Sequence, residues 1–274
     1  MPATALKPEQ LFTLDILAPN LVGYQAPQAA HDPAGDWTLS YRLHSLGRVR
    51  GPAVGGALGT VALTRKRLDD QRFSLQVTCQ KPAGGKFTDK LEARIEARAE
   101  RLPVAERWTW KSEIVDGDGQ RVADSGMERS ATAQPDALLF ANPPRRTPIH
   151  GPWTLAWLLF EAIGRLPREP FAPLSFTLVD DFDQIKPGGA LAYAQTQSVI
   201  LGDRPVQQTR IEELPQGRIH KTSWEMSGGR PVPLHVYHQL GQGIVPWVYW
   251  VDDRGRPLLI VSGIEAYVLE AGQK

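Results

Sequence analysis

Polar and apolar residues alternate in short segments along most of this chain, and Gly or Pro residues separate the segments. In residues 36–44, DWTLSYRLH, every second residue is apolar: Trp37, Leu39, Tyr41 and Leu43. A period of two places these side chains on one face of a β-strand. Similar segments occupy residues 59–64, 72–80, 107–115, 120–132, 189–201, 207–214, 218–227, 232–240, 245–251 and 258–269. The pattern predicts a mainly β protein built from antiparallel strands.

Residues 90–101, KLEARIEARAER, fit two structures. The segment is rich in residues that favour helices, and Leu91, Ile95 and Leu102 follow a helical spacing. Its apolar residues also alternate strictly with charged ones, which is typical of a long strand with one solvated face. We favour the strand because the neighbouring segments are predicted strands, and the helix remains the alternative.

The clearest helix signal is GPWTLAWLLFEAIGRLP, residues 151–167. Pro152 suits the first turn of a helix, Gly164 suits its carboxyl end, and Pro167 prevents continuation. We therefore predict a helix at about 152–164. Its apolar residues surround nearly the whole circumference, so it must be buried on almost all sides.

A flat sheet would cover only one side of such a helix. We therefore expect a strongly curved antiparallel sheet, or an incomplete barrel, wrapped around one central apolar helix. Residues 36–274 are predicted to form a single β-rich domain of this kind. Residues 1–35 are predicted to be an extended, partly ordered N-terminal segment.

Charge and cysteine content exclude several classes of protein. The formal net charge is +1, which lacks the basic excess that nucleic-acid binding and adhesion to anionic membranes require. The single cysteine, Cys79, permits no intramolecular disulfide and lies in an apolar alternation typical of a small buried side chain. The N-terminal residues show neither a signal peptide nor a transmembrane segment. We expect a periplasmic or otherwise exported location, with the leader absent from this chain, and a cytoplasmic location stays open as the alternative.

The search for catalytic and metal-binding motifs is mostly negative. The sequence has no Gly-x-Ser-x-Gly, His-Glu-x-x-His, Cys-x-x-Cys or Walker lysine motif, so we expect no cofactor and no metal. His235 and His238 would point to opposite faces of a strand. The acidic residues near Asp181 are predicted to form a solvated loop. A hydrolase that uses His150 or His220 remains an alternative without a supporting motif.

Tryptophan and tyrosine residues carry the positive functional signal. Five of them are candidates to line an apolar cavity: Trp153, Trp157, Trp224, Trp247 and Tyr249. Their alternative role is an ordinary core that loops and the N-terminal segment cover. Two further candidates, Arg145 and Arg146, lie in the Pro-rich loop PPRRTPIH, where they would hold an anionic head group or remain solvated.

Residues 36–47, 153–164 and 243–269, the last containing PWVYWVDDRGRPL, carry a resemblance to a known group. This order of strands, one hydrophobic helix and an aromatic hairpin resembles the bacterial Lol lipoprotein carriers and a related exported domain of unknown function. The resemblance implies a half-barrel with helical elements over an apolar mouth, and a periplasmic location in bacteria.

Together these observations predict a non-enzymatic, extracytoplasmic protein. It would bind an apolar or amphipathic, lipid-like molecule in the concave face of its sheet. Two alternatives stay open: a structural or interaction protein with no ligand cavity, and an unrecognised hydrolase.

Overall fold

A computed structural model describes residues 24–46, 56–200, 204–214, 217–227, 231–241, 243–263 and 265–270. Side chains are described in these ranges except at residues 200, 204–227 and 231. Most of the predicted N-terminal segment, residues 1–23, therefore lies outside the described residues. Residues 24–36 contain no helix or strand.

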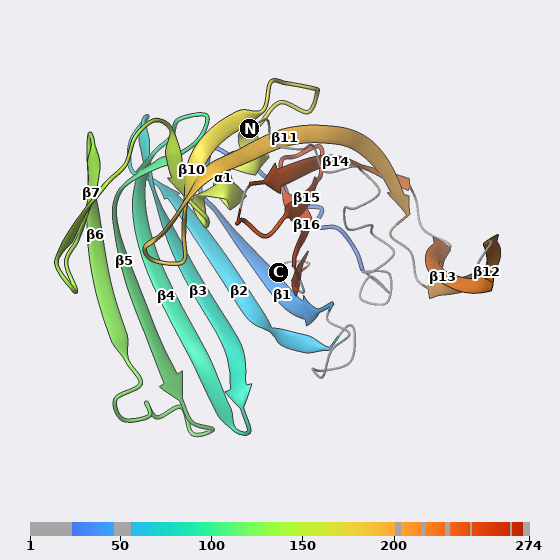
Figure 1. Cartoon of the computed structure of the whole chain (residues 1–274), viewed down its shortest axis with the longest axis horizontal. Helices are drawn as coiled ribbons and strands as arrows, with labels where there is room; N and C mark the ends of the chain where they lie inside the picture. The colour runs from blue at the N-terminus through green and yellow to red at the C-terminus, as the bar shows by residue number, and fades with distance from the viewer. Residues whose placement is uncertain are drawn as a thin grey trace.

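Fifteen strands form one large sheet, which curls strongly without closing (Figure 1). Its first half contains β1 (Trp37–Ser45), β2 (Ala57–Arg67), β3 (Arg72–Gly84), β4 (Phe87–Arg98), β5 (Val104–Val115), β6 (Met127–Gln134), β7 (Ala137–Phe140) and β8 (Arg145–Pro148). Its second half contains β9 (Trp153–Leu155), β10 (Leu174–Asp180), β11 (Gln184–Ile200), β14 (Pro231–Leu240), β15 (Trp247–Val251), β16 (Pro257–Ser262) and β17 (Glu265–Leu269). β12 (Arg204–Leu214) and β13 (Gly217–Ser227) form a separate two-stranded sheet. The predicted mainly β architecture is confirmed.

The two halves of the large sheet meet where β1 pairs with β17, from Tyr41 opposite Leu269 to Ser45 opposite Glu265. On either side of this seam, each strand pairs with a neighbour in the sequence, apart from the β12–β13 excursion. All these pairings are antiparallel except that of β9 with β10. The outermost strands are thus β8 and β9, which follow each other directly along the chain.

The edge strand β9 lies against β5 without pairing to it. The Trp153 and Trp108 ring centroids are 6.1 Å apart, and the Thr154 hydroxyl donates a hydrogen bond to the Pro103 carbonyl at 2.6 Å. Right-handed strand twist, accumulated over many strands, brings distant parts of a sheet together in this way. The result is the curl visible in Figure 1.

Most of residues 90–101 form a strand, in agreement with the two-residue period of their apolar side chains. β4 runs to Arg98 and pairs with β3 and β5 over its whole length. Ala93, Ile95 and Ala97 are buried, while Glu92 and Arg94 are exposed. The strand interpretation is confirmed, because burial of one alternating face outweighs intrinsic helix propensity.

The predicted helix at about 152–164 is wrong in its first half. Residues 153–155 form β9, which pairs in parallel with β10 from Thr177 to Val179. The helix α1 spans only Leu158–Arg165. Gly151 has a φ of +70°, so the chain turns sharply before β9, and the available edge of β10 then favours a strand.

α1 lies inside the curl (Figure 1), and its sequence LLFEAIGR is not wholly apolar. The Phe160 ring contacts Tyr41 of β1 and Tyr249 of β15, with centroids 5.8 Å and 6.3 Å apart. Seven of its eight residues are buried, and one of them is the charged residue Glu161. In the described part of the chain, no helix has the length and composition needed to cross a membrane.

Candidate functional site

The predicted aromatic residues divide between two clusters. The first cluster surrounds Phe160. The centroid of the Phe160 ring lies 5.5 Å from that of Trp157 and 6.1 Å from that of Trp247. The Trp247 and Tyr249 rings stack at 6.0 Å because both residues belong to one face of β15. Trp157 and Trp247 are partly exposed, whereas Tyr249 is fully buried. The structure therefore brings three of the candidates together.

Trp153 of β9 belongs to a second cluster, which also contains aromatic rings from β5, β7 and the β10–β11 turn. Its neighbour Trp108 contacts Phe140 at 6.0 Å and Phe182 at 6.4 Å. The Trp108 indole N–H also donates to the Phe182 carbonyl at 3.3 Å. Trp153 is buried in this packing. Trp224 belongs to β13, and its side chain lies outside the described residues.

Arg145 and Arg146 do not form a shared clamp. They are consecutive residues of β8 and point to opposite faces. The Arg145 guanidinium lies over the Phe140 ring at 4.5 Å and pairs with Asp183 at 2.9 Å, while Arg146 pairs with Asp136 at 2.7 Å. Arg145 thus borders the second aromatic cluster, and Arg146 lies away from it.

The inner face of the sheet continues beyond these clusters as one cross-strand row. This row, which we call the inner row, consists of Val61, Cys79, Leu91, Ser112 and Met127, which are direct register partners on β2 to β6. Exposure rises along it from 1% at Val61 and 8% at Cys79 to 38% at Met127. With four apolar or thiol side chains and the small hydroxyl of Ser112, the inner row is therefore a largely apolar surface that the core only partly covers.

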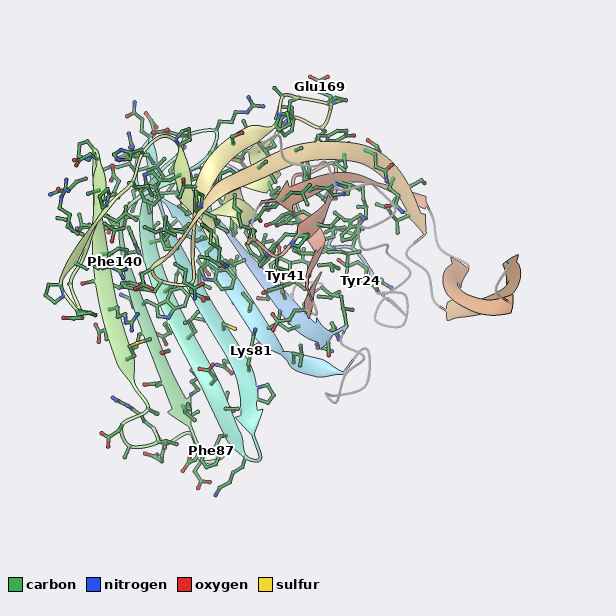
Figure 2. The ribbon with its side chains drawn as sticks, in the orientation of Figure 1. Tyr24, Tyr41, Lys81, Phe87, Phe140 and Glu169 are labelled. Carbon is green, nitrogen blue, oxygen red and sulfur yellow. The ribbon has the colours of Figure 1, made fainter. Side chains whose placement is uncertain are left out.

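Burial also falls along the strands, away from α1. Figure 2 places Tyr41 near the centre of the core, Lys81 farther along β3 and Phe87 at the tip of the β3–β4 hairpin. Tyr41 is fully buried, and Phe87 is 41% exposed. The part of the concave face that side chains leave most exposed therefore lies between the inner row and the tip of the β3–β4 hairpin.

Charged groups border the inner row. The Lys81 ammonium contacts both Glu265 carboxylate oxygens at 2.7 Å and 3.0 Å, linking β3 to β17. Burial raises the pKa of the Cys79 thiol to about 11, although the Lys81 charge opposes the shift. Cys79 is therefore a protonated, weakly reactive side chain at neutral pH.

The β10–β11 turn reaches into the curl and carries further acidic residues. Phe182 docks in the second aromatic cluster, and Asp180 pairs with Lys186. Asp181 has a φ of +48°, and its side chain is exposed. Partial desolvation within the turn, with the neighbouring Asp180 carboxylate, raises the pKa of Asp181 above its ordinary value.

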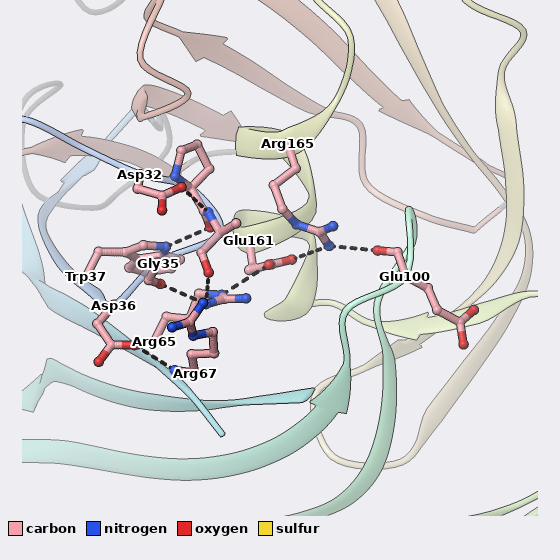
Figure 3. Close-up of polar contacts among 11 residues, drawn as sticks. Asp32, Gly35, Asp36, Trp37, Arg65, Arg67, Glu100, Glu161 and Arg165 are labelled. Atoms are coloured by element: carbon pink, nitrogen blue, oxygen red, sulfur yellow. Dashed lines mark hydrogen bonds and ion pairs between the residues drawn. The ribbon is translucent and has the colours of Figure 1, made fainter. Parts of the chain in front are cut away.

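The core contains a buried charge network that was not predicted from the sequence. Glu161 accepts hydrogen bonds from Arg65 at 3.2 Å and from Arg165 at 2.8 Å (Figure 3). Arg65 also donates to the carbonyls of Ala34 and Gly35 at 2.6 Å and 2.7 Å. The available signals were an arginine in phase with the inward Val61 and Leu63, and a glutamate in an otherwise apolar helix.

The turn that connects β15 and β16 in the aromatic hairpin holds the N-terminal segment in place. The buried Asp252 and Arg256 pair at 2.7 Å across this turn. Arg254 and Arg256 donate to the Ala29 carbonyl at 2.6 Å and 3.1 Å. The motif DDRGRP therefore has a clear anchoring role in this fold.

The candidate histidines belong to separate parts of the fold, namely the loop before β9, strand β13 and strand β14. His150 is exposed, and the side chain of His220 lies outside the described residues. His235 contacts Asp253 at 3.0 Å and Thr196 at 3.3 Å, while His238 lies on the opposite face of β14. Among the described side chains, no group of three or more His, Cys, Asp and Glu residues has the arrangement of a metal site.

Comparisons with known proteins give a structural likeness without a family assignment. No family model matches the sequence, and no curated protein matches it. A crystal structure of a β-barrel-like protein of the domain of unknown function DUF1849, from Brucella abortus, is similar over 89% of this chain and 98% of its own, at 10% identity and a TM-score of 0.49.

Proposed function

We propose that this protein is a non-enzymatic binding protein for an apolar or amphipathic molecule, held on the concave face of the sheet. The observation that supports the proposal is the inner row, which continues the apolar inner face beyond the buried core. Partly exposed apolar rows inside a concave surface are suited to apolar ligands, because binding removes their remaining area from water.

The neighbouring groups define the extent of the proposed site. Trp157 and Trp247 supply partly exposed rings on the α1 side. Leu91 and Met127 supply aliphatic surface, and the Lys81–Glu265 pair supplies a polar border. This combination suits an amphipathic molecule whose apolar part lies along the inner row and whose polar part meets the charged border.

A dansylated fatty acid tests the proposal, with binding followed by dansyl fluorescence in a titration. Met127→Ser removes an inner-row side chain that is already substantially exposed, so folding should survive. We expect the dissociation constant to rise roughly five-fold, which corresponds to about 1 kcal/mol of lost apolar contact.

Glu128→Ser is the matched control, because it changes the next residue of β6 on the outer face. It should leave the affinity for the dansylated fatty acid unchanged. Absence of binding to the unaltered protein, or equal effects of the two substitutions, would contradict the proposal and leave the structural or interaction role as the better explanation.

We also propose an extracytoplasmic, bacterial location, for which the resemblance to Lol-type carriers is the support. Fractionation of the source cells, followed by immunoblotting of each compartment, tests this. Recovery of the protein solely with the cytoplasmic fraction would contradict it.

A further inference from the structure

The outer face of β4, β5 and β6 has a groove of about 520 Å³. Volumes of about 300–1,000 Å³ are common for small-molecule sites. This groove lies on the opposite face of the sheet from the inner row, so it is independent of the function proposed above. Its charged lining side chains are Glu92, Arg94, Glu96, Arg107, Lys111 and Glu128.

The hollow follows from side-chain size. Thr109 on β5 is the register partner of Arg94 on β4 and of Ser130 on β6. Thr132, the partner of Arg107, adds a third short side chain. These hydroxyl residues form the floor, and the longer charged side chains on either side form the walls.

Charge in the groove is balanced. Arg94, Arg107 and Lys111 contribute three positive charges, which equals the three negative charges of the glutamates. Arg107 already pairs with Glu96 at 2.6 Å. This balance gives no net attraction for a phosphate or another highly charged ligand, which would require a basic excess.

Hydrogen-bonding capacity remains available at the centre. Among the described residues, Arg94, Glu92 and Glu128 have no ion-pair partner within 4.0 Å. Guanidinium groups donate, carboxylates accept, and the Thr109 and Ser130 hydroxyls do both. The apolar side chains of Trp108 and Ala131 are buried on the other face, so the apolar surface of the groove comes mainly from the aliphatic parts of its charged and hydroxyl side chains.

From this chemistry we propose that the groove binds a neutral saccharide. A sugar presents many hydroxyl groups, each a donor and an acceptor, and has no net charge to conflict with the mixed lining. Vicinal hydroxyls match a carboxylate such as Glu92 or a guanidinium such as that of Arg94. Without an exposed aromatic ring to stack on the sugar, affinity should be weak, with a Kd of about 1 mM.

Saturation-transfer difference NMR with maltose, cellobiose and N,N′-diacetylchitobiose tests the proposal on the full chain. At least one disaccharide should give a saturating signal. Ser130→Trp, which fills the floor, should abolish that signal, and Arg94→Met should weaken it at least about five-fold. Gln80→Trp, on the outer face of β3 but outside the groove, is the control and should leave binding unchanged.

Circular dichroism of each variant separates loss of binding from loss of fold. If Ser130→Trp unfolds, Arg94→Met still decides, because Arg94 is exposed. Absence of binding by all three sugars, or binding that survives both groove substitutions in folded protein, would overturn the proposal. Glycine serves as a zwitterionic competitor, and its binding in place of the sugars would also overturn it.

Discussion

Glu161 is the residue whose chemistry depends most on its surroundings. Its side chain is fully buried, and Arg65, its partner across the core, is only 3% exposed. A buried carboxylate is tolerated only when it is paired and hydrogen-bonded, and Glu161 receives a guanidinium from each side. The sequence contained both residues, but their pairing requires the fold, since one lies in β2 and the other in α1.

Removing the Glu161 charge should therefore be costly. Glu161→Gln leaves two guanidinium groups facing each other with no carboxylate between them. We expect the free energy of unfolding to fall by about 3–5 kcal/mol, measured by urea denaturation.

Glu270→Gln is the matched control, because Glu270 pairs with Arg42 at 2.7 Å while both side chains remain substantially exposed. Its effect should be below about 0.5 kcal/mol. Similar losses for the two variants would show that burial does not govern these pairs.

Asp181 gives a pH-dependent prediction. Partial desolvation and the Asp180 carboxylate raise its pKa in the folded state. An acid whose folded pKa is raised favours folding most below its unfolded pKa, and this contribution is lost as pH rises through the folded pKa. Asp181→Asn should therefore be more stable than the unaltered protein at pH 7, by less than about 1 kcal/mol, and should lose that advantage at pH 3.

Thermal unfolding at the two pH values measures this effect. Asn is suitable because it tolerates the positive φ at this position and can still accept a hydrogen bond from Gln184. A stability gain that is the same at both pH values would point to backbone or packing effects in place of ionisation.

At the scale of elements, the period of two was the reliable signal. It predicted the long strands and favoured a strand for residues 90–101. It missed β7, β8, β9 and β10, which are short or lack a clear alternation, and it placed β8 in a Pro-rich loop. Residues 153–155 have a helical context in the sequence, but they form a strand because the edge of β10 is there to pair with them.

The junction between α1 and the β15–β16 turn permits a sharp test. Gly255 has a φ of +83°, and an added Cβ would lie 2.4 Å from the Gly164 carbonyl oxygen and 2.5 Å from Pro33. Gly255→Ala should therefore destabilise the protein by more than about 2 kcal/mol, because backbone strain and steric overlap combine.

Gly119→Ala isolates the first of these two effects. Gly119 has a φ of +79° and no heavy atom within 4 Å of an added Cβ. Its substitution should cost only the conformational strain, about 1 kcal/mol. Equal losses for the two variants, measured by urea denaturation, would show that the α1 junction is not tightly packed.

At the scale of the whole molecule, the curl was predicted for a reason that is only partly right. The predicted curl depended on a helix that was apolar around its circumference from residue 152. The actual helix is shorter and contains Glu161, and aromatic residues from β1, β15 and β17 supply much of the packing around it. The β1–β17 seam had no local sequence signal, because it joins opposite ends of the described chain.

The candidate site was predictable only in part. Aromatic enrichment in 243–269 and around residue 155 identified the cluster at Phe160, but burial of Trp153 and Tyr249 depends on tertiary packing. The inner row joins single residues from five strands, so its surface emerges only once the register is known.

Graded burial along the strands predicts graded amide protection. Amide hydrogens at Leu75 and Ile95, deep in the core, should exchange much more slowly than those near Phe87 at the hairpin tip. Hydrogen–deuterium exchange at peptide resolution measures the difference. Uniform protection along β3 and β4 would show that the hairpin opens only with the whole sheet.

The seam between β1 and β17 has a kinetic consequence. Apart from the β11–β14 pairing, which spans the β12–β13 excursion, the rest of the large sheet joins strands that are neighbours in the sequence, so each half can assemble by adding neighbours. Only the five residue pairs of the seam demand that the two ends of the described chain find each other. We therefore expect the two halves of the sheet to form separately and the β1–β17 pairing that joins them to be the slowest step of folding.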